Sequence, residues 1–393
     1  MRVLWVTPWF PSSPLDGRFG FIYRSAEALL NLGVQLRIVL LRPWVPAVGR
    51  WADRVDARPP ADFGPRFEFR VITAPRIPRM LALEQSYRLF RVLTDRRLRA
   101  EARQFEPDVV HAHTEWAAYS AVPVSNSMGL PVVVTLHSGD TTPQIVALAK
   151  RRGRLTRTLG AATRVAIVGR PLRAYLADFG VDGRNVSVVP NGFVLPADLQ
   201  EAGGPDWTGE LRLVTVSVLT RPKAVDVGLR GLASARRSGV AATYDIVGEG
   251  PERAKLERLA AELGLTQHVR FHGLLPHLEA MRMLQGAHLF LLPSYREAFG
   301  VAALEGMAAG ALVVAVEGQG PADFVTHTQT GLLVPPQDAE AIGDAIRWVD
   351  SERETAAGVA RAGRARAREG FTWDEHGRRL LELYSPLRDL KLA

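Results

Sequence analysis

Residues 293–310 read Pro-Ser-Tyr-Arg-Glu-Ala-Phe-Gly-Val-Ala-Ala-Leu-Glu-Gly-Met-Ala-Ala-Gly. An apolar run at residues 289–292 precedes them and is typical of a buried strand. A polar turn with Glu297 follows, and Gly300 then opens a helix of small residues that carries Glu305. A strand, a turn and a helix in this order predict a parallel α/β sheet, which binds its ligands at the carboxyl ends of the strands.

The same stretch predicts the chemistry of its ligand. The first N–H groups of a helix have no partner within the helix and favour an anion. Ionised carboxylates accept strong hydrogen bonds from hydroxyl groups. Glu297 and Glu305 beside such an anion site therefore indicate a ligand that combines phosphates with many hydroxyls, which is a sugar nucleotide.

Strands alternate with helices along the whole chain. In the first half we predict strands at residues 3–7, 36–41, 109–111, 132–136, 165–168 and 186–189, and helices at 21–31, 80–104, 115–127 and 171–179. In the second half we predict strands at 213–218, 243–247, 269–271, 289–292 and 312–316, and helices at 225–238, 251–263, 278–284, 301–309, 339–349, 354–369 and 374–383.

This alternation predicts two doubly wound, Rossmann-like α/β domains that face a cleft. The first spans residues 1–195 and the second 196–373, with a Pro- and Gly-rich linker from about 195 to 209. We expect a C-terminal helix, about residues 374–393, to pack back on the first domain.

Composition excludes several classes of protein. The chain of 393 residues suits two domains, and it has no Cys, which excludes disulfides and thiolate metal sites. His and Asp nowhere show a metal-ligand spacing, so we expect no metal and no other cofactor. The N-terminal apolar run is too short for a signal peptide, and no apolar run is long enough to cross a membrane.

The positive charge is concentrated in the first half. Residues 1–195 hold 27 Lys+Arg and 15 Asp+Glu, which makes +12, and the remainder brings the chain to +8. One explanation is an ordinary solvated surface in an arginine-rich protein, because arginine greatly outnumbers lysine. The other is contact with an anionic membrane or a phosphate-linked acceptor. We do not expect nucleic acid as a partner, because no recognisable nucleic-acid-binding module accompanies the charge.

The residues around Glu297 and Glu305 resemble a known family. The pattern Ser294-x-x-Glu297-x-Phe299-Gly300-x-x-x-Leu304-Glu305-x-Met307-Ala308-x-Gly310 is similar to the signature of the retaining GT-B glycosyltransferases of family 4, also called glycosyl transferases group 1. The resemblance runs over nearly the whole chain and is densest from about residue 186 to 336.

The resemblance implies roles for the residues of this signature. Glu297 would hold hydroxyls of the donor sugar and take part in catalysis, and Glu305 would bind the ribose. Main-chain groups of Phe299, Gly300 and Val301 would contact the sugar and the diphosphate.

A second motif implies the cations that neutralise the donor diphosphate. The family places an Arg and a Lys five residues apart after the first strand of the second domain. Lys223 matches, and we expect it to be catalytic as well as donor-binding. Val218 stands at the Arg position and Ala224 where the family has Gly, so we expect Arg221 to supply the second charge.

Two glycine-containing loops complete the expected donor site. Gly248 and Gly250 resemble the loop near the nucleotide base. The run from Gly318 to Asp323 resembles a loop at the sugar or phosphate, in which Gly320 would bind the donor.

The first domain contributes an expected acceptor side. Gly17 and Gly20 open a helix and would let a phosphate or the acceptor approach. The segment from Thr135 to Asp140 resembles the family's Thr-x-His-Gly-x-Asp, which makes His137 the expected catalytic histidine and places Asp140 beside the acceptor. His111 and His113 flank another strand end, and we include His113 among the acceptor residues.

The expected activity is therefore hexosyl transfer from a UDP- or GDP-sugar to a glycan, glycolipid or lipid-linked acceptor, with retention of configuration and without metal. We expect cell-surface polysaccharide synthesis, in the cytoplasm or peripherally on the inner face of the plasma membrane. Two alternatives remain open. One is a sugar-nucleotide epimerase or phosphorylase of the same fold, and the other is a non-catalytic nucleotide-sugar-binding protein.

Overall fold

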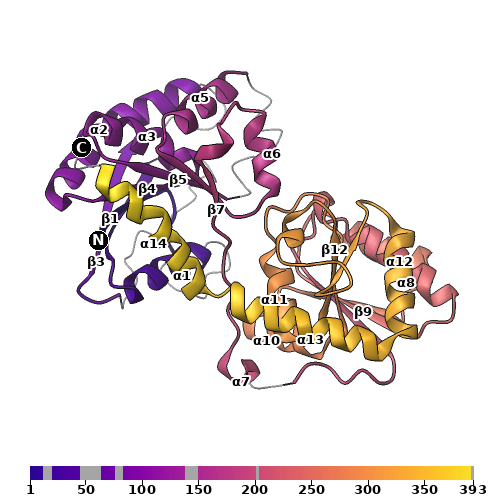
Figure 1. Cartoon of the computed structure of the whole chain (residues 1–393). Coiled ribbons are helices and arrows are strands. Elements are labelled where there is room, and N and C mark those ends of the chain that lie inside the picture. The colour runs from indigo at the N-terminus through magenta and orange to yellow at the C-terminus, as the bar shows by residue number, and fades with distance from the viewer. Residues whose placement is uncertain (12–19, 45–62, 76–82, 138–148, 201–202, 391–393) are drawn as a thin grey trace. The chain divides into compact units, whose positions relative to one another are not determined.

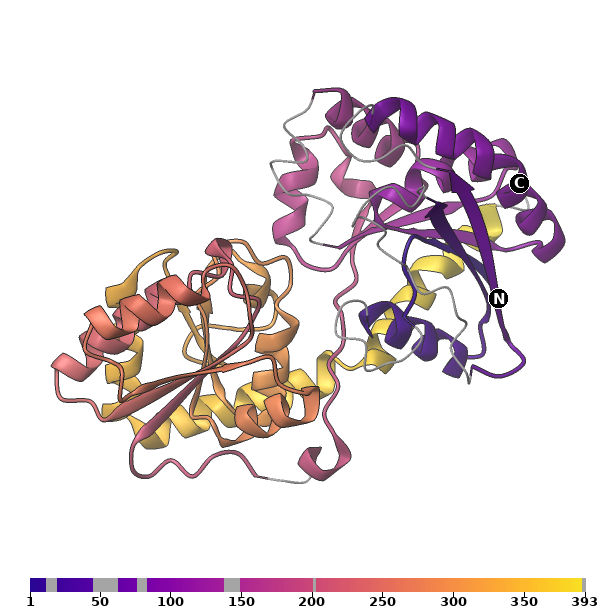
Figure 2. The same ribbon diagram turned by 180° about the vertical axis from the view of Figure 1, so that it is seen from behind.

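A computed structural model describes the chain except for residues 12–19, 45–62, 76–82, 138–148, 201–202 and 391–393. The described residues form two compact units (Figures 1 and 2). The first unit comprises Met1–Asn191 together with Trp373–Ala393, and the second comprises Gly192–Thr372. The predicted fold class, two doubly wound α/β domains, is confirmed.

The first unit has a seven-stranded parallel sheet with the order β3-β2-β1-β4-β5-β6-β7. The strands are β1 (Arg2–Thr7), β2 (Gln35–Trp44), β3 (Phe67–Pro75), β4 (Val109–His113), β5 (Val132–Leu136), β6 (Arg164–Ile167) and β7 (Val186–Val188). The central strands β1, β4 and β5 are almost entirely buried, as their continuous apolar runs predict.

Helices cover both faces of this sheet (Figures 1 and 2). On one face α1 (Gly20–Asn31) packs against α14 (Trp373–Leu390), and on the other α3 (Thr114–Ser127) packs between α2 (Leu83–Phe105) and α5 (Ala149–Gly160). A short helix, α6 (Pro171–Ala177), precedes the last strand. Leu380, Tyr384 and Leu387 of α14 belong to the apolar core of this unit.

The second unit has a six-stranded parallel sheet with the order β10-β9-β8-β11-β12-β13. The strands are β8 (Leu211–Val216), β9 (Ala242–Val247), β10 (Val269–Gly273), β11 (Leu289–Leu292), β12 (Leu312–Val316) and β13 (Leu332–Val334). The helices are α7 (Ala197–Gln200), α8 (Val225–Arg237), α9 (Arg253–Glu262), α10 (His277–Gly286), α11 (Val301–Ala309), α12 (Ala339–Ser351) and α13 (Arg353–Gly370).

Small residues let α11 lie close to the sheet. A Cβ atom on Gly306 would come within 2.9 Å of the Phe290 ring on β11, so only glycine fits at this contact. Gly300 and Gly310 bound the helix with positive φ angles of 90° and 105°, a conformation that glycine adopts without strain. The sequence therefore fixes both ends of α11 and its distance from the strand.

Several predicted boundaries and elements were wrong. Strand β3 and helix α5 were not predicted from the sequence, and the short helix α7 lies within the predicted linker. Strand β8 ends at Val216, two residues earlier than predicted, which leaves Val218 in the following loop.

Candidate active site

The loops at the carboxyl ends of β11 and β12 hold Glu297 in the second unit. The backbone N–H of Glu297 donates to Oε1 of Gln319 over 2.9 Å, and its carbonyl accepts from the N–H of Gly320 over 2.8 Å. A Cβ atom on Gly320 would lie 2.3 Å from the Cα of Phe299, so the two loops touch backbone to backbone. These contacts therefore hold the backbone that carries the Glu297 carboxylate.

Lys223 is the cation beside this carboxylate. It ends a short 3-10 helix, η3 (Arg221–Lys223), in the loop after β8. Its Nζ lies 2.6 Å from Oε2 of Glu297, and both side chains are partly buried. The N–H of Tyr295 also donates to the carbonyl of Pro222, which ties this loop to the one after β11. The structure thus brings together two residues that lie 74 positions apart in sequence.

The rest of the expected cation pair differs from the family pattern. Arg221 is exposed at the start of η3, and the Val218 side chain is 61% exposed. Ala224 has φ 49° and ψ 39°, the left-handed region in which glycine is favoured. The backbone after Lys223 therefore keeps the conformation that the family's glycine would adopt, with alanine in its place.

Gly248 and Gly250 pack against the neighbouring loop. A Cβ atom on Gly248 would come 1.8 Å from the carbonyl oxygen of Ser217, and one on Gly250 would come 2.3 Å from that of Leu219. The N–H of Leu219 donates to the carbonyl of Glu249 over 2.8 Å. These glycines let the loops after β8 and β9 pair closely at the carboxyl edge of the sheet.

Glu305 lies on the second turn of α11, and its carboxylate also has a partner. Oε1 of Glu305 is 3.0 Å from Nε2 of His277, the first residue of α10. The N-terminal end of α11 at Gly300 has no side-chain cap, so the N–H groups of Val301 and its neighbours are available to an anion.

Neither His277 nor Gln319 was predicted from the sequence. His277 starts helix α10 after a three-residue loop that follows strand β10, so it lies at the same carboxyl edge of the sheet as Glu305. Gln319 lies in the glycine-rich loop after β12, and its polar side chain at this edge of the sheet is the signal for its contact with the loop that carries Glu297.

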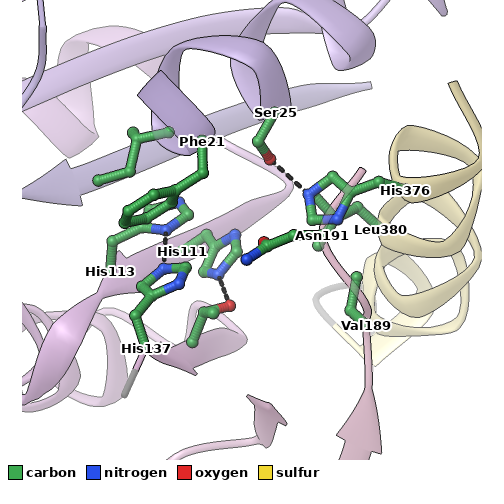
Figure 3. A pocket seen from close by; sticks show the side chains of 11 residues that line it. Phe21, Ser25, His111, His113, His137, Val189, Asn191, His376 and Leu380 are labelled. Carbon is green, nitrogen blue, oxygen red and sulfur yellow. Dashed lines mark hydrogen bonds between the residues drawn. The ribbon is translucent and has the colours of Figure 1, made fainter. Parts of the chain in front are cut away.

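Four histidines gather at the carboxyl edge of the first unit's sheet (Figure 3). His111 and His113 are on β4, His137 directly follows β5, and His376 is on α14. The ring of His113 stacks on that of His137 at a centroid distance of 5.6 Å and an interplanar angle of 9°. The ring of Phe21 on α1 also contacts that of His137, at a centroid distance of 4.6 Å.

Both ring nitrogens of His111 and both of His376 have hydrogen-bond partners. His111 Nδ1 lies 2.5 Å from the Tyr384 hydroxyl and its Nε2 2.6 Å from Oγ1 of Thr135. His376 Nε2 lies 2.7 Å from Oγ of Ser25, and its Nδ1 donates to the carbonyl of Pro190 over 2.7 Å.

The remaining pair faces a small cavity. His113 Nδ1 lies 3.3 Å from His137 Nε2, and the other nitrogen of each ring is buried with no hydrogen-bond partner among the described residues. The carboxamide oxygen of Asn191, which also lines the cavity, has none either. The cavity measures about 10 Å³, which is room for one water molecule, and its lining is polar enough to hold one.

All four rings are neutral at physiological pH. Burial, and then the charge of His376, lowers the pKa of His137 to about 3. Burial also lowers the pKa of His376 to about 4, although the Pro190 carbonyl acts in the opposite direction. Burial and the neighbouring histidines lower the pKa values of His111 and His113 well below the ordinary value. A neutral imidazole can donate at one nitrogen and accept at the other.

Of the other predicted residues, Gly17 and Asp140 lie outside the described residues. Gly20 is the first residue of α1. In the part of the chain that the structure describes, no three or more His, Asp and Glu side chains are grouped so that they could hold a metal ion. No described helix is both long and apolar enough to cross a membrane.

Comparison with known proteins identifies both halves. The family model of the glycosyl transferases group 1 matches residues 205–366, and that of glycosyltransferase family 4 matches residues 21–195. Glycogen synthase of Mycobacterium tuberculosis is 30% identical over 282 residues, which are 69% of this chain and 67% of that protein. The D-inositol 3-phosphate glycosyltransferase of Frankia alni is 32% identical over 73% of this chain and 76% of its own length.

Solved structures agree on the fold. Sucrose-phosphate synthase from Thermosynechococcus elongatus superposes with a TM-score of 0.73 at 21% identity, over 98% of this chain and 99% of that one. HepE of Anabaena, solved in complex with UDP, superposes with a TM-score of 0.72 at 19% identity, over 98% and 100%. The resemblance inferred from the motif is confirmed: the chain is a GT-B glycosyltransferase and belongs to family 4, the glycosyl transferases group 1.

Proposed function

We propose that the chain transfers a hexosyl group from a nucleoside diphosphate sugar to a glycan, glycolipid or lipid-linked acceptor, with retention and without a metal ion. The observation that carries this proposal is the Lys223–Glu297 pair, held by loops next to the uncapped end of α11. A cation, a carboxylate and free N–H groups at one sheet edge suit a diphosphate joined to a sugar.

In this proposal Lys223 turns from Glu297 to the diphosphate when the donor binds. Glu297 then accepts hydrogen bonds from the donor sugar, and Glu305 accepts them from the ribose hydroxyls. Negative charge grows on the departing phosphate as its bond to the anomeric carbon breaks. Lys223, Arg221 and the N–H groups at Gly300 stabilise that charge, and a metal ion is not needed for this role.

Retention follows if the acceptor attacks from the face that the phosphate leaves. The acceptor oxygen bonds to the anomeric carbon, the carbon–phosphate oxygen bond breaks, and the acceptor hydroxyl proton passes to the leaving phosphate oxygen. We propose that His137, neutral because it is buried, contacts the donor sugar near this centre. The HepE structures with UDP and UDP-glucose support a uridine nucleotide as the first donor to test.

Relatives suggest the kind of acceptor. Similar proteins carry names that include teichuronic acid biosynthesis, phosphatidylinositol monomannoside and 2-deoxystreptamine, so the family acts on polymers, lipids and small molecules. We propose cell-surface glycan synthesis in the cytoplasm, on an acceptor presented at the inner face of the plasma membrane. The basic charge of the first half supports this placement.

Thermal-shift binding of UDP, GDP and ADP and their sugars, to wild type and Glu305→Ala, tests the donor site. We expect one nucleotide series to raise the melting temperature of wild type and not of the variant. No stabilisation by any nucleotide would favour the non-catalytic alternative, which Val218 and Ala224 suggest. Conversion of a UDP-sugar without an acceptor would favour an epimerase. Activity lost in EDTA and restored by a divalent cation would refute metal independence.

A further inference from the structure

His277 of the second unit contacts a carboxylate of the proposed donor site. It is the first residue of α10, and its Nε2 lies 3.0 Å from Oε1 of Glu305 on α11. An ionised carboxylate only accepts hydrogen bonds, so Nε2 of His277 carries a proton and donates it. In the proposed reaction Glu305 has a role, and His277 has none.

The imidazole of His277 contributes little to the packing of α10. The buried residues of this helix are Ala280, Met281 and Leu284. The His277 side chain is 43% exposed, whereas that of Glu305 is 15% exposed. A pair in which one partner is this exposed adds little to the stability of a fold. The main effect of the contact therefore falls on the Glu305 carboxylate.

The Glu305 carboxylate depends on His277 for its position. Among the residues that the structure describes, His277 is its one hydrogen-bond partner. The rest of α11 consists of small and apolar residues, whose side chains offer no hydrogen bond. A glutamate side chain has several rotatable bonds, so its carboxylate samples several positions unless a partner holds it. His277 therefore holds the carboxylate before a ligand arrives.

A carboxylate that is held through one oxygen can still bind a diol. Its two oxygens offer about four lone-pair positions, and His277 takes one of them. The 2′- and 3′-hydroxyls of a ribose are neighbours on one ring and can both donate to the positions that remain. The N–H groups that follow Gly300 on the same helix favour a phosphate. A ribose joined to a diphosphate therefore suits this arrangement.

We propose that His277 is a positioning residue that makes this site select ribose over 2′-deoxyribose. It donates to Oε1 of Glu305 and holds the carboxylate where both ribose hydroxyls reach it. It does not contact the reacting atoms, so the transfer step itself does not depend on it. The inference rests on the proposed function, in which Glu305 binds the ribose of the donor.

Isothermal titration with UDP, GDP and ADP, and with the 2′-deoxy form of each, tests this role. For the nucleotide that binds wild type, His277→Ala should weaken the affinity about fivefold, because a flexible side chain is no longer held in place. The 2′-deoxy form should lose only about twofold, since it lacks one of the hydroxyls that bind Glu305. The selectivity for ribose therefore falls. In steady-state kinetics the donor KM should rise while kcat stays unchanged.

Other substitutions at this position identify the atom that acts. The amide nitrogen of glutamine reaches about as far as Nε2 of histidine, so His277→Gln should bind within about twofold of wild type. The amide of asparagine reaches only to the place of Nδ1, and His277→Asn should behave as His277→Ala does.

His272→Ala is the matched control elsewhere in the second unit. It removes a similar surface pair, in which His272 Nε2 lies 2.6 Å from Oδ1 of Asp245. Glu305 keeps its partner in this variant, which should therefore bind nucleotides as wild type does. Thermal melts of the free proteins check folding, and we expect each variant to melt within about 2 °C of wild type.

Four results would overturn the role of His277. These are unchanged or tighter binding by His277→Ala, an unchanged selectivity for ribose, an equal loss in His277→Gln, and an equal loss in His272→Ala. Nucleotide binding by wild type that Glu305→Ala abolishes supports the donor site on its own, so an unaffected His277→Ala would then refute this inference alone. Wild type that binds none of the nucleotides would refute the donor site, and the role of His277 with it.

Discussion

The two units present opposite electrostatics at the carboxyl edges of similar parallel sheets. In the second unit, Lys223 pairs with Glu297 between two loops, and His277 of α10 pairs with Glu305 of α11; the four side chains are partly exposed. In the first unit, four buried histidines are neutral and bonded mainly to hydroxyl and carbonyl groups. One site is built to exchange ion-pair partners with a charged ligand. The other is built to exclude charge.

This difference suggests a division of labour between the units. Paired charges bind an anion with little reorganisation, because a cation and a helix end are already present. Neutral rings around a small buried cavity can direct hydroxyl groups without attracting phosphate. The following experiments test this contrast between the two units.

Acid should unfold the first unit before the second. The pKa values of the four histidines are lowered in the folded state, so the unfolded state, with pKa near 6.5, binds more protons. The stabilisation is complete above pH 6.5 and is lost as pH falls. At pH 5.5 the lowered pKa values of His137 and His376 together should cost about 3 kcal/mol of the free energy of unfolding. Hydrogen exchange followed by mass spectrometry should show earlier opening of β4 and β5 than of β8 and β11.

The second unit is the internal control for this experiment, although the pKa of its His288 is lowered as well, chiefly by burial. Simultaneous opening of both sheets at one pH would contradict the contrast between the units.

Removing the carboxylates should affect two different steps. We expect Glu297→Ala to lower turnover about 10³-fold, because the donor sugar and Lys223 lose their common partner. Glu305→Ala should instead weaken donor binding at least 100-fold, since hydrogen bonds from the ribose to a charged group are lost. Steady-state kinetics and donor titration separate the two. Near-normal transfer by both variants would refute the site.

His113 should position His137 rather than contact the substrate. In His113→Phe the ring stacking remains but the hydrogen bond to Nε2 of His137 is lost. We expect turnover to fall about tenfold with unchanged donor KM, by analogy with the loss of a hydrogen bond that orients another histidine. His113→Asn restores a polar atom near Nδ1 and should recover part of the rate. A normal rate in His113→Phe with a defect in His113→Asn would show that His113 matters only for packing.

The smallest effect is expected from adding a charge. Val218 is 61% exposed, so Val218→Arg should cost no packing energy. A guanidinium at the family's usual position should tighten donor binding by up to about fivefold, the value of an exposed ion pair. Isothermal titration with UDP measures this change. Val218→Gln, of similar length without charge, is the control, and equal gains in both variants would argue against electrostatics.

The sequence predicted the strands that consist of one continuous apolar run. Strands such as residues 132–136 and 289–292 are apolar except for Thr135, and the structure gives them the predicted bounds. Strand β3 was missed because it is at the edge of its sheet and alternates polar with apolar residues, as in Phe67, Glu68, Phe69 and Arg70. Helix α5 was missed because arginine and glycine dominate it, with Leu155 and Leu159 as its buried anchors.

The candidate site was predictable to the level of its motif. Glu297, Glu305 and Lys223 follow from spacing and resemblance. Their partners do not, because His277 and Gln319 reach the site through loops that no short-range pattern connects to it. The histidine cluster likewise depends on α14, which brings His376 to Pro190 from 186 residues away.

Helix α14 also has a consequence for biosynthesis. Tyr384 and Leu387 complete the core of the first unit, yet they are translated after the whole of the second unit. The second unit, Gly192–Thr372, is a single uninterrupted segment. A ribosome therefore releases every residue of the second unit before the first has its full set. The first unit therefore cannot complete its core until α14 has been translated, and the side of α1 that packs against α14 stays exposed until then.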